Sequence, residues 1–585
     1  MSSRFFKINI FGKLIESFSS KYLLLPIFLF LAIFFVYPVV SMLFISFFDR
    51  EGSFTFINYY EIFRGYNVSI LLNTLKISGW TTIITVTLAY PVAYYLSTAA
   101  KRNANMLMII VLLPLWTSVL VRAFAWIVLF GRGGVINSTL EFVGVDPVEI
   151  LFSYFSVIVA MTHAFMPIAV LSMYATMQNI DGRLKHAAAT LGAEPGNVFW
   201  RVYFPISFPG VASSALVTFI LSVGIFIHPA LLGSPQQTMI AQIIIQQVDE
   251  LFNWGLAASI SVMVMFVSIL FIIIFDRFVG VVSITGAQGV GRPSGKIMNA
   301  LTAIAGNISV KLSRFFAIFQ PQNATLNSEK ISFPIKFLSV LILIFLAVPL
   351  LFLIPVSFTE SPFVEWPPRG FSWQWYERYF TSPVWIEATI RSTVVGIATA
   401  SFSLLVGVPA AFAINRAKFR GKGLVLPYIL MPLVVPNIII ALAVFYFFSD
   451  LGLIGTNLGL TIGHTILAVP YVVLTLVAVL QNYDHQLDHA AWTLGAKPII
   501  AFKRITLPLI KVGFITSFLF AFMRSFDEIA IALFVSSGLQ STLPKKLWSE
   551  AHHAISPTLA AVSTILIVIV TVLVVVTELL KRKQK

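Results

Sequence analysis

A polar stretch, His186-Ala187-Ala188-Ala189-Thr190-Leu191-Gly192-Ala193, returns 303 positions later as His489-Ala490-Ala491-Trp492-Thr493-Leu494-Gly495-Ala496. The register extends beyond the octet, since Asp181 matches Asp484 and Pro205 matches Pro508. Each copy lies between long apolar runs. A doubled hydrophilic segment in such a chain predicts two related membrane halves, each presenting one contact surface on the cytoplasmic side.

The composition predicts an integral membrane protein. Of the 585 residues, 58% are hydrophobic and only 11% are charged, and the mean hydropathy is +0.91. A soluble protein of this length needs a more charged surface, so the expected surroundings are a lipid bilayer. The net charge of +15 comes from basic residues in short segments between apolar runs. Cytoplasmic loops collect such residues, so no nucleic-acid partner is expected. The absence of Cys excludes disulfides and thiol catalysis.

Twelve apolar segments are long enough to cross a bilayer, which takes about 20 residues. The first, near 22–48, is too long for a signal peptide and is expected to be a retained span. The expected spans lie near 22–48, 70–98, 106–130, 152–178, 207–232 and 255–280, and then near 333–358, 388–415, 423–448, 458–481, 510–536 and 555–580.

Basic residues predict the orientation, because loops rich in Lys and Arg stay in the cytoplasm. Lys101-Arg102, both copies of the repeat and the tail Lys581-Arg582-Lys583 alternate correctly to share one side. Both termini are therefore expected in the cytoplasm. Lys545 and Lys546 oppose this trend.

The expected domains are a cytoplasmic N-terminal segment (1–21), a first half (22–280, with the loop 179–205), a linker (281–332), a second half (333–580, with the loop 482–508) and a basic cytoplasmic tail (581–585). Apolar residues in the linker recur every three or four positions, which favours an amphipathic helix on the membrane surface. The alternative is a disordered tether. The apolar stripe consists of Ile297, Leu301, Ile304, Ile308, Leu312, Phe315 and Phe319.

The two halves differ in length at one place. Pro114 matches Pro432 at a spacing of 318, whereas Pro167 matches Pro470 at 303, so the first half has 15 more residues between these points. The extra residues fall in an external segment around 131–151, where insertions are tolerated. Two explanations of this insertion stay open: a loop adapted to an external partner, and neutral drift of the loop length.

Each copy of the repeat has the composition of a short helix–turn–helix. Arg183–Leu191 favours a helix, and Gly192 stands where a left-handed C-cap is wanted. Pro195 suits the first position of a second helix, and Pro205 is expected to end it. Gly495, Pro498 and Pro508 repeat the pattern.

This pattern resembles the permease subunits of ATP-binding-cassette (ABC) importers, whose cytoplasmic signature runs Glu-Ala-Ala, three residues, Gly, and later Leu-Pro. His stands in place of Glu in both copies, which puts the family's acidic contact in doubt. The resemblance implies an all-α polytopic membrane protein of about twelve transmembrane helices, arranged as two six-helix type I ABC-importer permease halves. It also implies that each copy is a coupling element for an ATPase. The residues concerned are His186, Ala187, Ala188, Leu191, Gly192 and Ala193, and then His489, Ala490, Ala491, Leu494, Gly495 and Ala496.

The resemblance further implies two ABC ATPase subunits on the cytoplasmic side, an external solute-binding protein, and a place in the bacterial inner membrane. The chain itself carries no P-loop, because the string Gly291–Lys296 lacks the spacing that cradles phosphates. We therefore expect no cofactor on this chain, with ATP and Mg on the partner subunits. Neither a catalytic residue nor a metal site is expected.

Charges within an expected span mark a candidate solute path, since they are costly in a membrane. Arg524, Phe526, Asp527 and Glu528 lie in the run 510–536. The two acids could attract an organic cation, with Phe526 offering a cation–π face. An internal ion pair with Arg524, or a helix end nearer to solvent, is an equally open interpretation. Structural roles are favoured for Arg122, His163, His228 and His464.

The string Ser525-Phe526-Asp527-Glu528, with Thr542-Leu543-Pro544 beyond it, resembles the spermidine/putrescine-type branch of the permeases, with two permeases fused in one chain. A polyamine or similar solute is implied. Related fused permeases carry ferric iron, thiamine or aminophosphonates, and these stay open. A secondary transporter driven by an ion gradient is the alternative of a different class; its repeats would be expected at binding-site helices.

Overall fold

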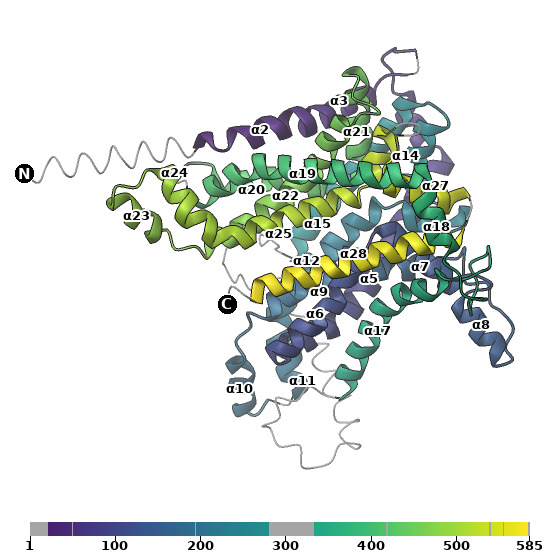
Figure 1. The fold of residues 1–585 in the computed structure, drawn as a ribbon, viewed down its shortest axis with the longest axis horizontal. Helices are drawn as coiled ribbons and strands as arrows, with labels where there is room; N and C mark the ends of the chain where they lie inside the picture. The colour runs from purple at the N-terminus through teal and green to yellow at the C-terminus, as the bar shows by residue number, and fades with distance from the viewer. Residues whose placement is uncertain are drawn as a thin grey trace, which may run out of the picture.

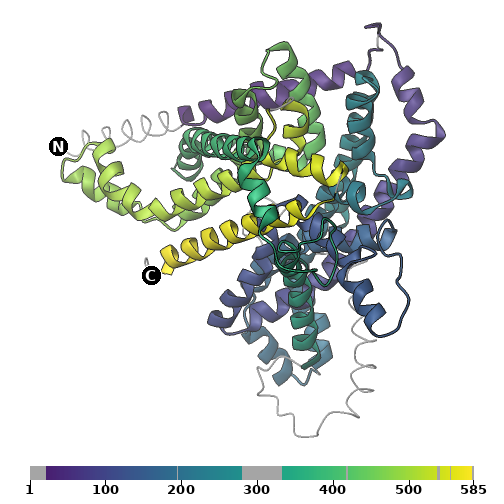
Figure 2. The same ribbon diagram turned by 45° about the vertical axis from the view of Figure 1, so that its right-hand side comes forward.

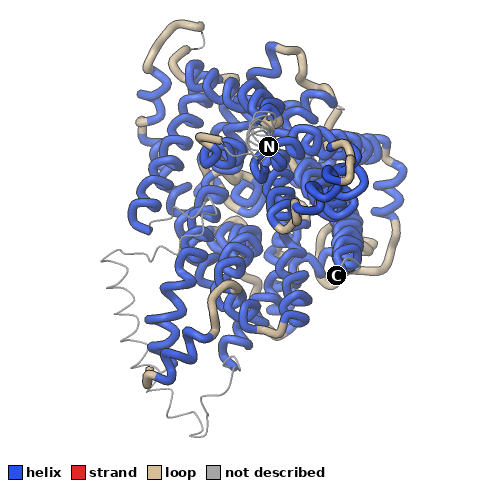
Figure 3. The backbone as a smooth tube through the Cα atoms, turned by 90° about the vertical axis from the view of Figure 1, so that its left-hand side faces the viewer, coloured by secondary structure: helices blue, strands red, loops and turns tan. Residues whose placement is uncertain are grey.

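The computed structural model describes residues 21–49, 51–193, 195–279, 333–416, 419–536, 540–553 and 555–582. The expected linker helix, residues 1–20 of the N-terminal segment and the last three residues of the tail lie outside these ranges. Within them the chain is helical, and no strand is present (Figure 3). An isolated antiparallel bridge joins Phe48 and Phe54.

The helices of the first half follow the expected apolar runs, with short helices between them (Figure 1). They are α2 (Leu25–Leu31), the π-helical η1 (Ala32–Val36), α3 (Tyr37–Ile45), α4 (Ile57–Ile62), α5 (Gly65–Thr98), α6 (Lys101–Trp116), α7 (Val119–Phe130), α8 (Val135–Phe142), α9 (Tyr154–Met177), α10 (Arg183–Thr190), α11 (Pro195–Val198), the π-helical η2 (Phe199–Tyr203), α12 (Phe204–Val223), α13 (Ile227–Leu232), the 3₁₀ turn η3 (Pro235–Gln237), α14 (Ile240–Asp249) and α15 (Trp254–Val279).

The second half repeats most of this order. Its helices are α17 (Phe333–Val356), α18 (Gln374–Thr381), α19 (Pro383–Arg416), α20 (Lys422–Val434), α21 (Asn437–Asp450), α22 (Asn457–Gln481), α23 (Gln486–Thr493), α24 (Pro498–Ala501), the π-helical η5 (Phe502–Thr506), α25 (Leu507–Phe526), α26 (Ala530–Val535), α27 (Leu543–His553) and α28 (Pro557–Arg582). The extra residues of the first half form α8 and its flanking loops, between α7 and α9.

Nine described helical segments are long and apolar enough to cross a membrane, and a tenth results if the bent pair α20 and α21 counts as one span. The expected spans at 70–98 and 555–580 do form helices, α5 and α28. Helix α5 is not among the nine, and the stretch Pro557–Val572 of α28 is apolar.

Four of the expected spans are not continuous helices, and in this respect the prediction was wrong. The run 423–448 bends by 92° between α20 and α21, and 106–130 is divided at Thr117-Ser118 between α6 and α7. The runs 207–232 and 510–536 are likewise interrupted, after α12 and after α25. Hydropathy averaged over about 20 residues does not reveal such breaks, because one or two polar residues or a proline change the average little.

The first span of each half packs against helices of the other half. The helix α2 contacts α19 and α20, and α3 contacts α21, whereas α17 contacts α5, α6 and α7. Figure 2 shows the purple N-terminal helices beside green helices, and the dark green α17 among blue ones. Phe28 stacks on Tyr428 with ring centroids 4.7 Å apart, and Ser339 Oγ donates to the carbonyl of Pro91 at 3.0 Å. The sequence halves are therefore interlocked in space.

Candidate coupling helices and central contact

The repeated stretch forms a short helix in each half, α10 and α23. Ala-rich segments favour a helix, and the glycine that follows ends it in a left-handed conformation, with φ +81° at Gly192 and +86° at Gly495. The N–H of Ala193 donates to the carbonyl of Ala188 at 3.1 Å. The N–H of Ala496 donates to Ala491 at 3.0 Å. Both helix ends thus have the Schellman geometry in which glycine avoids a Cβ clash.

Both helices project from one side of the bundle, and the short helices α8, α14, α18 and α27 lie at the opposite end (Figure 1). Leu191 and Leu494 are each 89% exposed. Matched leucines earlier in each helix, Leu184 and Leu487, are also exposed. A polar helix that presents apolar side chains at equivalent places in both halves has the character of a protein contact.

The other predicted coupling residues lie on the same helices or at their ends. Their exposure agrees between the halves except at one alanine: Ala188 is half-buried and Ala491 is buried. The exposed members are His186, Ala187 and Gly192 with their matches His489, Ala490 and Gly495, and the half-buried ones are Ala193 and Ala496.

The expected end of a separate second helix at Pro205 and Pro508 was wrong. The chain continues through a π-helical turn into the next span, so Gly196–Val223 and Phe502–Phe526 are continuous. The N–H of Phe204 donates to Phe199, five residues back. Pro205 follows in the first turn of α12. At that position its missing N–H costs little, and the wider π turn accepts the ring.

The two candidate coupling helices, α10 and α23, are anchored by different chemistry. Asp488 is 3% exposed; it forms an ion pair with Arg416 and accepts hydrogen bonds from Tyr483 Oη at 2.9 Å and Thr506 Oγ1 at 2.7 Å. Its match 303 positions earlier is Lys185.

Lys185 lies against aromatic rings. Its Nζ is 4.1 Å from the ring centroid of Tyr203 and 5.0 Å from that of Tyr94. Burial lowers the pKa of Lys185 below its usual range. The same position in the two halves thus carries opposite charges, held by an ion pair in one and by cation–π contacts in the other.

The helix breaks of the two halves meet in the interior. A Cβ added to Gly224, just after α12, would lie 2.7 Å from Cβ of Pro436, which stands between α20 and α21. The match of Gly224 is Asp527, just after α25. Asp527 Oδ1 accepts from the N–H of Val119, the first residue of α7, at 3.0 Å. Two equivalent contacts therefore close the centre, one between Gly and Pro and one between a carboxylate and a helix N-terminus.

The other predicted path residues form a compact group beside this contact. Arg524 Nη1 is 2.6 Å from Glu528 Oε2 in an ion pair, and Glu528 Oε1 accepts from the N–H of Ile531 at 3.0 Å. Phe526 stacks on Phe522 with centroids 5.5 Å apart. The ion-pair alternative is thus present, and Glu528 also caps α26. Arg524 keeps 20% of its side chain exposed.

The polar residues for which structural roles were favoured are all buried. Arg122 Nη1 donates to the carbonyl of Ala164 at 3.0 Å, a ring nitrogen of His163 lies 3.1 Å from the carbonyl of Leu346, and one of His464 lies 2.8 Å from Ser525 Oγ. Both ring nitrogens of His228 lack a hydrogen-bond partner. Across the described ranges, no group of three or more His, Cys, Asp or Glu residues could hold a metal ion.

Sequence reasoning missed the contacts that join the halves. The signal for the breaks was present, because Pro114 and Pro432 match near the ends of α6 and α20. The opposite charges at Lys185 and Asp488 were also visible in the alignment of the halves. Nothing in the sequence indicated that Asp527 would reach Val119.

Comparison with known proteins agrees with the duplicated architecture. The family model described as "Binding-protein-dependent transport system inner membrane component" matches residues 89–283 and again residues 403–585. The spermidine/putrescine transport system permease protein PotC of Haemophilus influenzae is 30% identical over 240 residues, which are 41% of this chain and 93% of the relative. The PotB protein of the same organism is 29% identical over 273 residues, 45% of this chain and 96% of the relative.

Two solved structures of a bacterial alginate ABC transporter match part of the chain. One, described as in complex with an alginate pentasaccharide-bound periplasmic protein, has a TM-score of 0.41 at 18% identity and covers 45% of this chain and 94% of its own. The other has a TM-score of 0.42 at 17% identity and covers 47% and 99%. Each family match includes one repeat of the opening stretch and the span that follows it. The chain belongs to the family of binding-protein-dependent transport system inner-membrane components, and it carries the family's domain twice.

Proposed function

We propose that this chain is a transmembrane permease subunit of an ATP-driven importer, with one ATPase subunit docked on α10 and a second on α23. The observation that carries the proposal is the pair Leu191 and Leu494, each 89% exposed at the end of a polar helix. Exposed leucines on polar helices are suited to an apolar groove in a partner. Because α10 and α23 are alike, we expect two ATPase subunits that are identical or similar to each other. ATP and Mg would be held by those partners.

A continuous helix connects each docking surface to the central contact. From α10 the chain turns at Gly192 and enters the segment Gly196–Val223, which is 28 residues long and so spans about 42 Å. It ends at Gly224, against Pro436. The segment Phe502–Phe526 leads in the same way to Asp527. Closure of the ATPases would therefore move α12 and α25 as levers, and would separate Gly224 from Pro436 and Asp527 from Val119.

The solute that best fits is a polyamine of the spermidine or putrescine type. The curated relatives described above carry that solute in their names. Opening of the central contact would free Asp527 from the α7 N-terminus, and a carboxylate released in a low-dielectric path attracts an organic cation strongly. Phe526 would offer an aromatic face nearby. Ferric iron, thiamine and aminophosphonates remain the alternatives.

An external binding protein would deliver the solute to the end opposite α10 and α23. The family description names such a dependence. On the orientation predicted from basic residues, α8, α14, α18 and α27 would face the outside, and both termini would be cytoplasmic.

The test is uptake by proteoliposomes that contain the full chain, its ATPase subunits and its binding protein. We expect uptake of labelled spermidine or putrescine that requires ATP, is blocked by vanadate and persists in the presence of an ionophore. Uptake without ATP that collapses with an ionophore would instead identify a secondary transporter. A competition panel of unlabelled spermidine, putrescine, thiamine, ferric chelate and aminoethylphosphonate identifies the solute class. Failure of the two polyamines to compete would overturn the polyamine assignment alone.

A further inference from the structure

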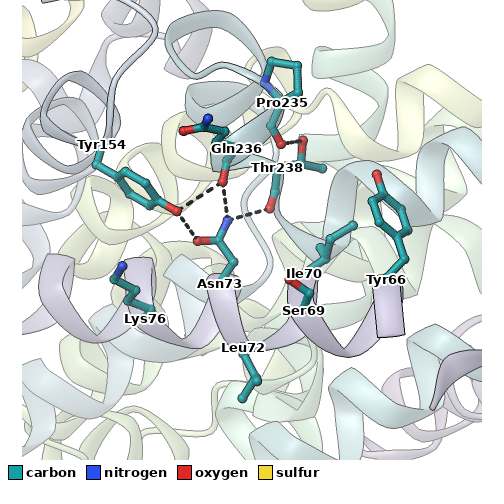
Figure 4. A pocket seen from close by; sticks show the side chains of 10 residues that line it. All are labelled: Tyr66, Ser69, Ile70, Leu72, Asn73, Lys76, Tyr154, Pro235, Gln236 and Thr238. Carbon is teal, nitrogen blue, oxygen red and sulfur yellow. Dashed lines mark hydrogen bonds between the residues drawn. The ribbon is translucent and has the colours of Figure 1, made fainter. Parts of the chain in front are cut away.

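A pocket of about 350 Å³ opens on the first half, between α5, the start of α9 and the segment around η3 (Figure 4). It lies outside the central contact and the coupling helices. Its lining combines a lysine, two tyrosines and four other polar residues with three apolar side chains. These are Tyr66, Ser69, Ile70, Leu72, Asn73, Lys76, Tyr154, Pro235, Gln236 and Thr238.

The floor of the pocket is held by Asn73. Its Nδ2 donates to the carbonyls of Gln236 and Thr238, each at 3.0 Å, and its Oδ1 accepts from Tyr154 Oη at 2.8 Å. These bonds hold the non-helical backbone at Gln236 and Thr238 against α5, and they occupy both the Nδ2 and the Oδ1 atom of Asn73. Lys76 is not part of this network: its Nζ lies 4.9 Å from the ring centroid of Tyr154. Hydrogen bonds thus hold the pocket wall in place, and the ammonium group of Lys76 lies at the edge of the pocket.

Lys76 lies on an exposed stripe of α5. Leu72, Trp80 and Ile83 are 60%, 52% and 57% exposed, and the spacing of three or four residues places them on the same helix face as Lys76. Large apolar side chains exposed along a membrane helix face lipid chains. A lysine and a tryptophan one turn apart on such a face are typical of the boundary between hydrocarbon and headgroups.

The length of α5 places Lys76 at that boundary. Lys76 is 22 residues from the end of the helix at Thr98, or about 33 Å along the axis, and Lys101-Arg102 follow directly. The hydrocarbon core is about 30 Å thick. If the basic pair marks the cytoplasmic surface, Lys76 reaches the outer one. The irregular backbone at Gln236 and Thr238 agrees, because such backbone is not tolerated against hydrocarbon.

The second half repeats the frame of the pocket, but its cation stands in the place of Asn73 and not of Lys76. Arg391, the match of Asn73, donates to the carbonyl of Gln540 at 3.0 Å. The N–H of Leu543 donates to Ser392 Oγ at 2.7 Å, as that of Ile240 does to Thr74 Oγ1 at 2.8 Å. The matches of Lys76 and Tyr154, however, are Val394 and Asn457. The lysine and the tyrosine are therefore particular to the first half, and the tie between helix and loop does not require them.

We propose that this pocket binds the headgroup phosphate of an anionic phospholipid from the outer leaflet, with Lys76 as the counter-ion. The hydroxyls of Tyr66 and Ser69 line the same pocket and supply donors. The acyl chains lie along Trp80 and Ile83, on the membrane side of Lys76. The bound lipid fills the space between α5 and the η3 segment. The η3 segment follows α13 by one turn, and α13 begins next to the central contact.

The test is native mass spectrometry of the purified full-length chain titrated with phosphatidylglycerol, with phosphatidylcholine as the zwitterionic comparison. Lys76→Gln is expected to weaken phosphatidylglycerol binding about fivefold, and Lys76→Arg to restore it. Lys336→Gln, an exposed lysine on α17, is the matched control for general charge and should leave binding unchanged. Glycerophosphoglycerol, which has the headgroup without acyl chains, should not compete.

Equal binding by Lys76→Gln and the wild type would overturn the proposal, as would an equal loss in Lys336→Gln. Competition by glycerophosphoglycerol at the same concentration as the lipid would overturn the assignment to a lipid. Unchanged thermal unfolding of lipid-free Lys76→Gln shows that any loss of binding does not come from misfolding. None of these outcomes depends on which solute the importer carries.

Discussion

The backbone N–H of Val119 donates a hydrogen bond to Oδ1 of Asp527 at 3.0 Å, although the two residues are 408 positions apart. Asp527 acts as an N-terminal cap for a helix of the other half. The equivalent contact, Gly224 on Pro436, is made by shape alone. The central closure therefore has a polar side and an apolar side, and only the polar side can be weakened by removing a charge.

Replacing Asp527 should loosen the closure. Asp527→Ala removes the cap of α7 and is expected to destabilise the closed form by about 1 kcal/mol, a change of about fivefold in the open population. The measurement is the ATPase activity of the reconstituted complex without binding protein, which should rise. Asp527→Asn keeps an acceptor for Val119 and should show less than half of the effect. Identical basal activity in Asp527→Ala and the wild type would contradict a role in closure.

The exposed leucines should matter for assembly and not for folding. Leu191→Ala and Leu494→Ala are each expected to weaken binding of the ATPase subunit about tenfold, the loss typical of a central interface residue. Thermal unfolding of the isolated chain should stay unchanged, because neither side chain is packed. Leu405→Ala, an equally apolar exposed change on α19, is the control for ATPase binding. Full ATPase affinity in the double variant would rule out these leucines as anchors.

The glycines after the coupling helices are required for backbone conformation and not for space. No atom lies within 4 Å of a Cβ added at Gly192 or Gly495, but both have positive φ. Gly192→Ala and Gly495→Ala should each cost about 1 kcal/mol at the helix end and lower ATPase affinity several-fold. Gly182→Ala is the control, since Gly182 has equal space and a φ of −57°. A loss in the control as large as in the test variants would count against the conformational explanation.

The two anchors of the coupling helices should not be interchangeable. Asp488→Ala leaves Arg416 without its partner; because Arg416 is about one-third exposed, we expect a cost of about 2 kcal/mol, below that of a fully buried pair. Lys185→Gln should cost about 1 kcal/mol through its lost cation–π contacts. Amide hydrogen exchange in α23 and α10 measures both. Two further variants swap the charges between the halves. In Lys185→Asp the new carboxylate should lack a cationic partner, and in Asp488→Lys the new ammonium should be repelled by Arg416. Wild-type protection in both would refute this assignment.

Arg524 and Glu528 allow the structural and transport roles to be separated. If the ion pair is structural, the double change Arg524→Gln with Glu528→Gln should keep more uptake than either single change, because neither partner is then left buried and unpaired. If Glu528 instead binds the solute cation, Glu528→Gln should raise KM for uptake whether or not Arg524 is present. Measuring KM and kcat for all four combinations distinguishes the two.

Much of the fold could be predicted from local patterns. The apolar runs located the helices, because a membrane helix satisfies its own backbone bonds and needs only length and hydropathy. The short helices α10 and α23 were predictable down to their C-caps, since Gly192 and Gly495 determine the geometry of the helix ends within a few residues. The π turns before Pro205 and Pro508 were not, because a proline at a helix start and a proline at a helix end look alike in sequence.

By itself, the sequence determined that the chain is a duplicated permease with one copy of the repeated short helix in each half, because repeats, hydropathy and caps act over short stretches. Tertiary structure alone decided the exchange of α2 and α17 between the halves, the capping of α7 by Asp527, and the pocket that joins Lys76 to Tyr154. Those contacts depend on how the breaks and the long helices pack across hundreds of residues.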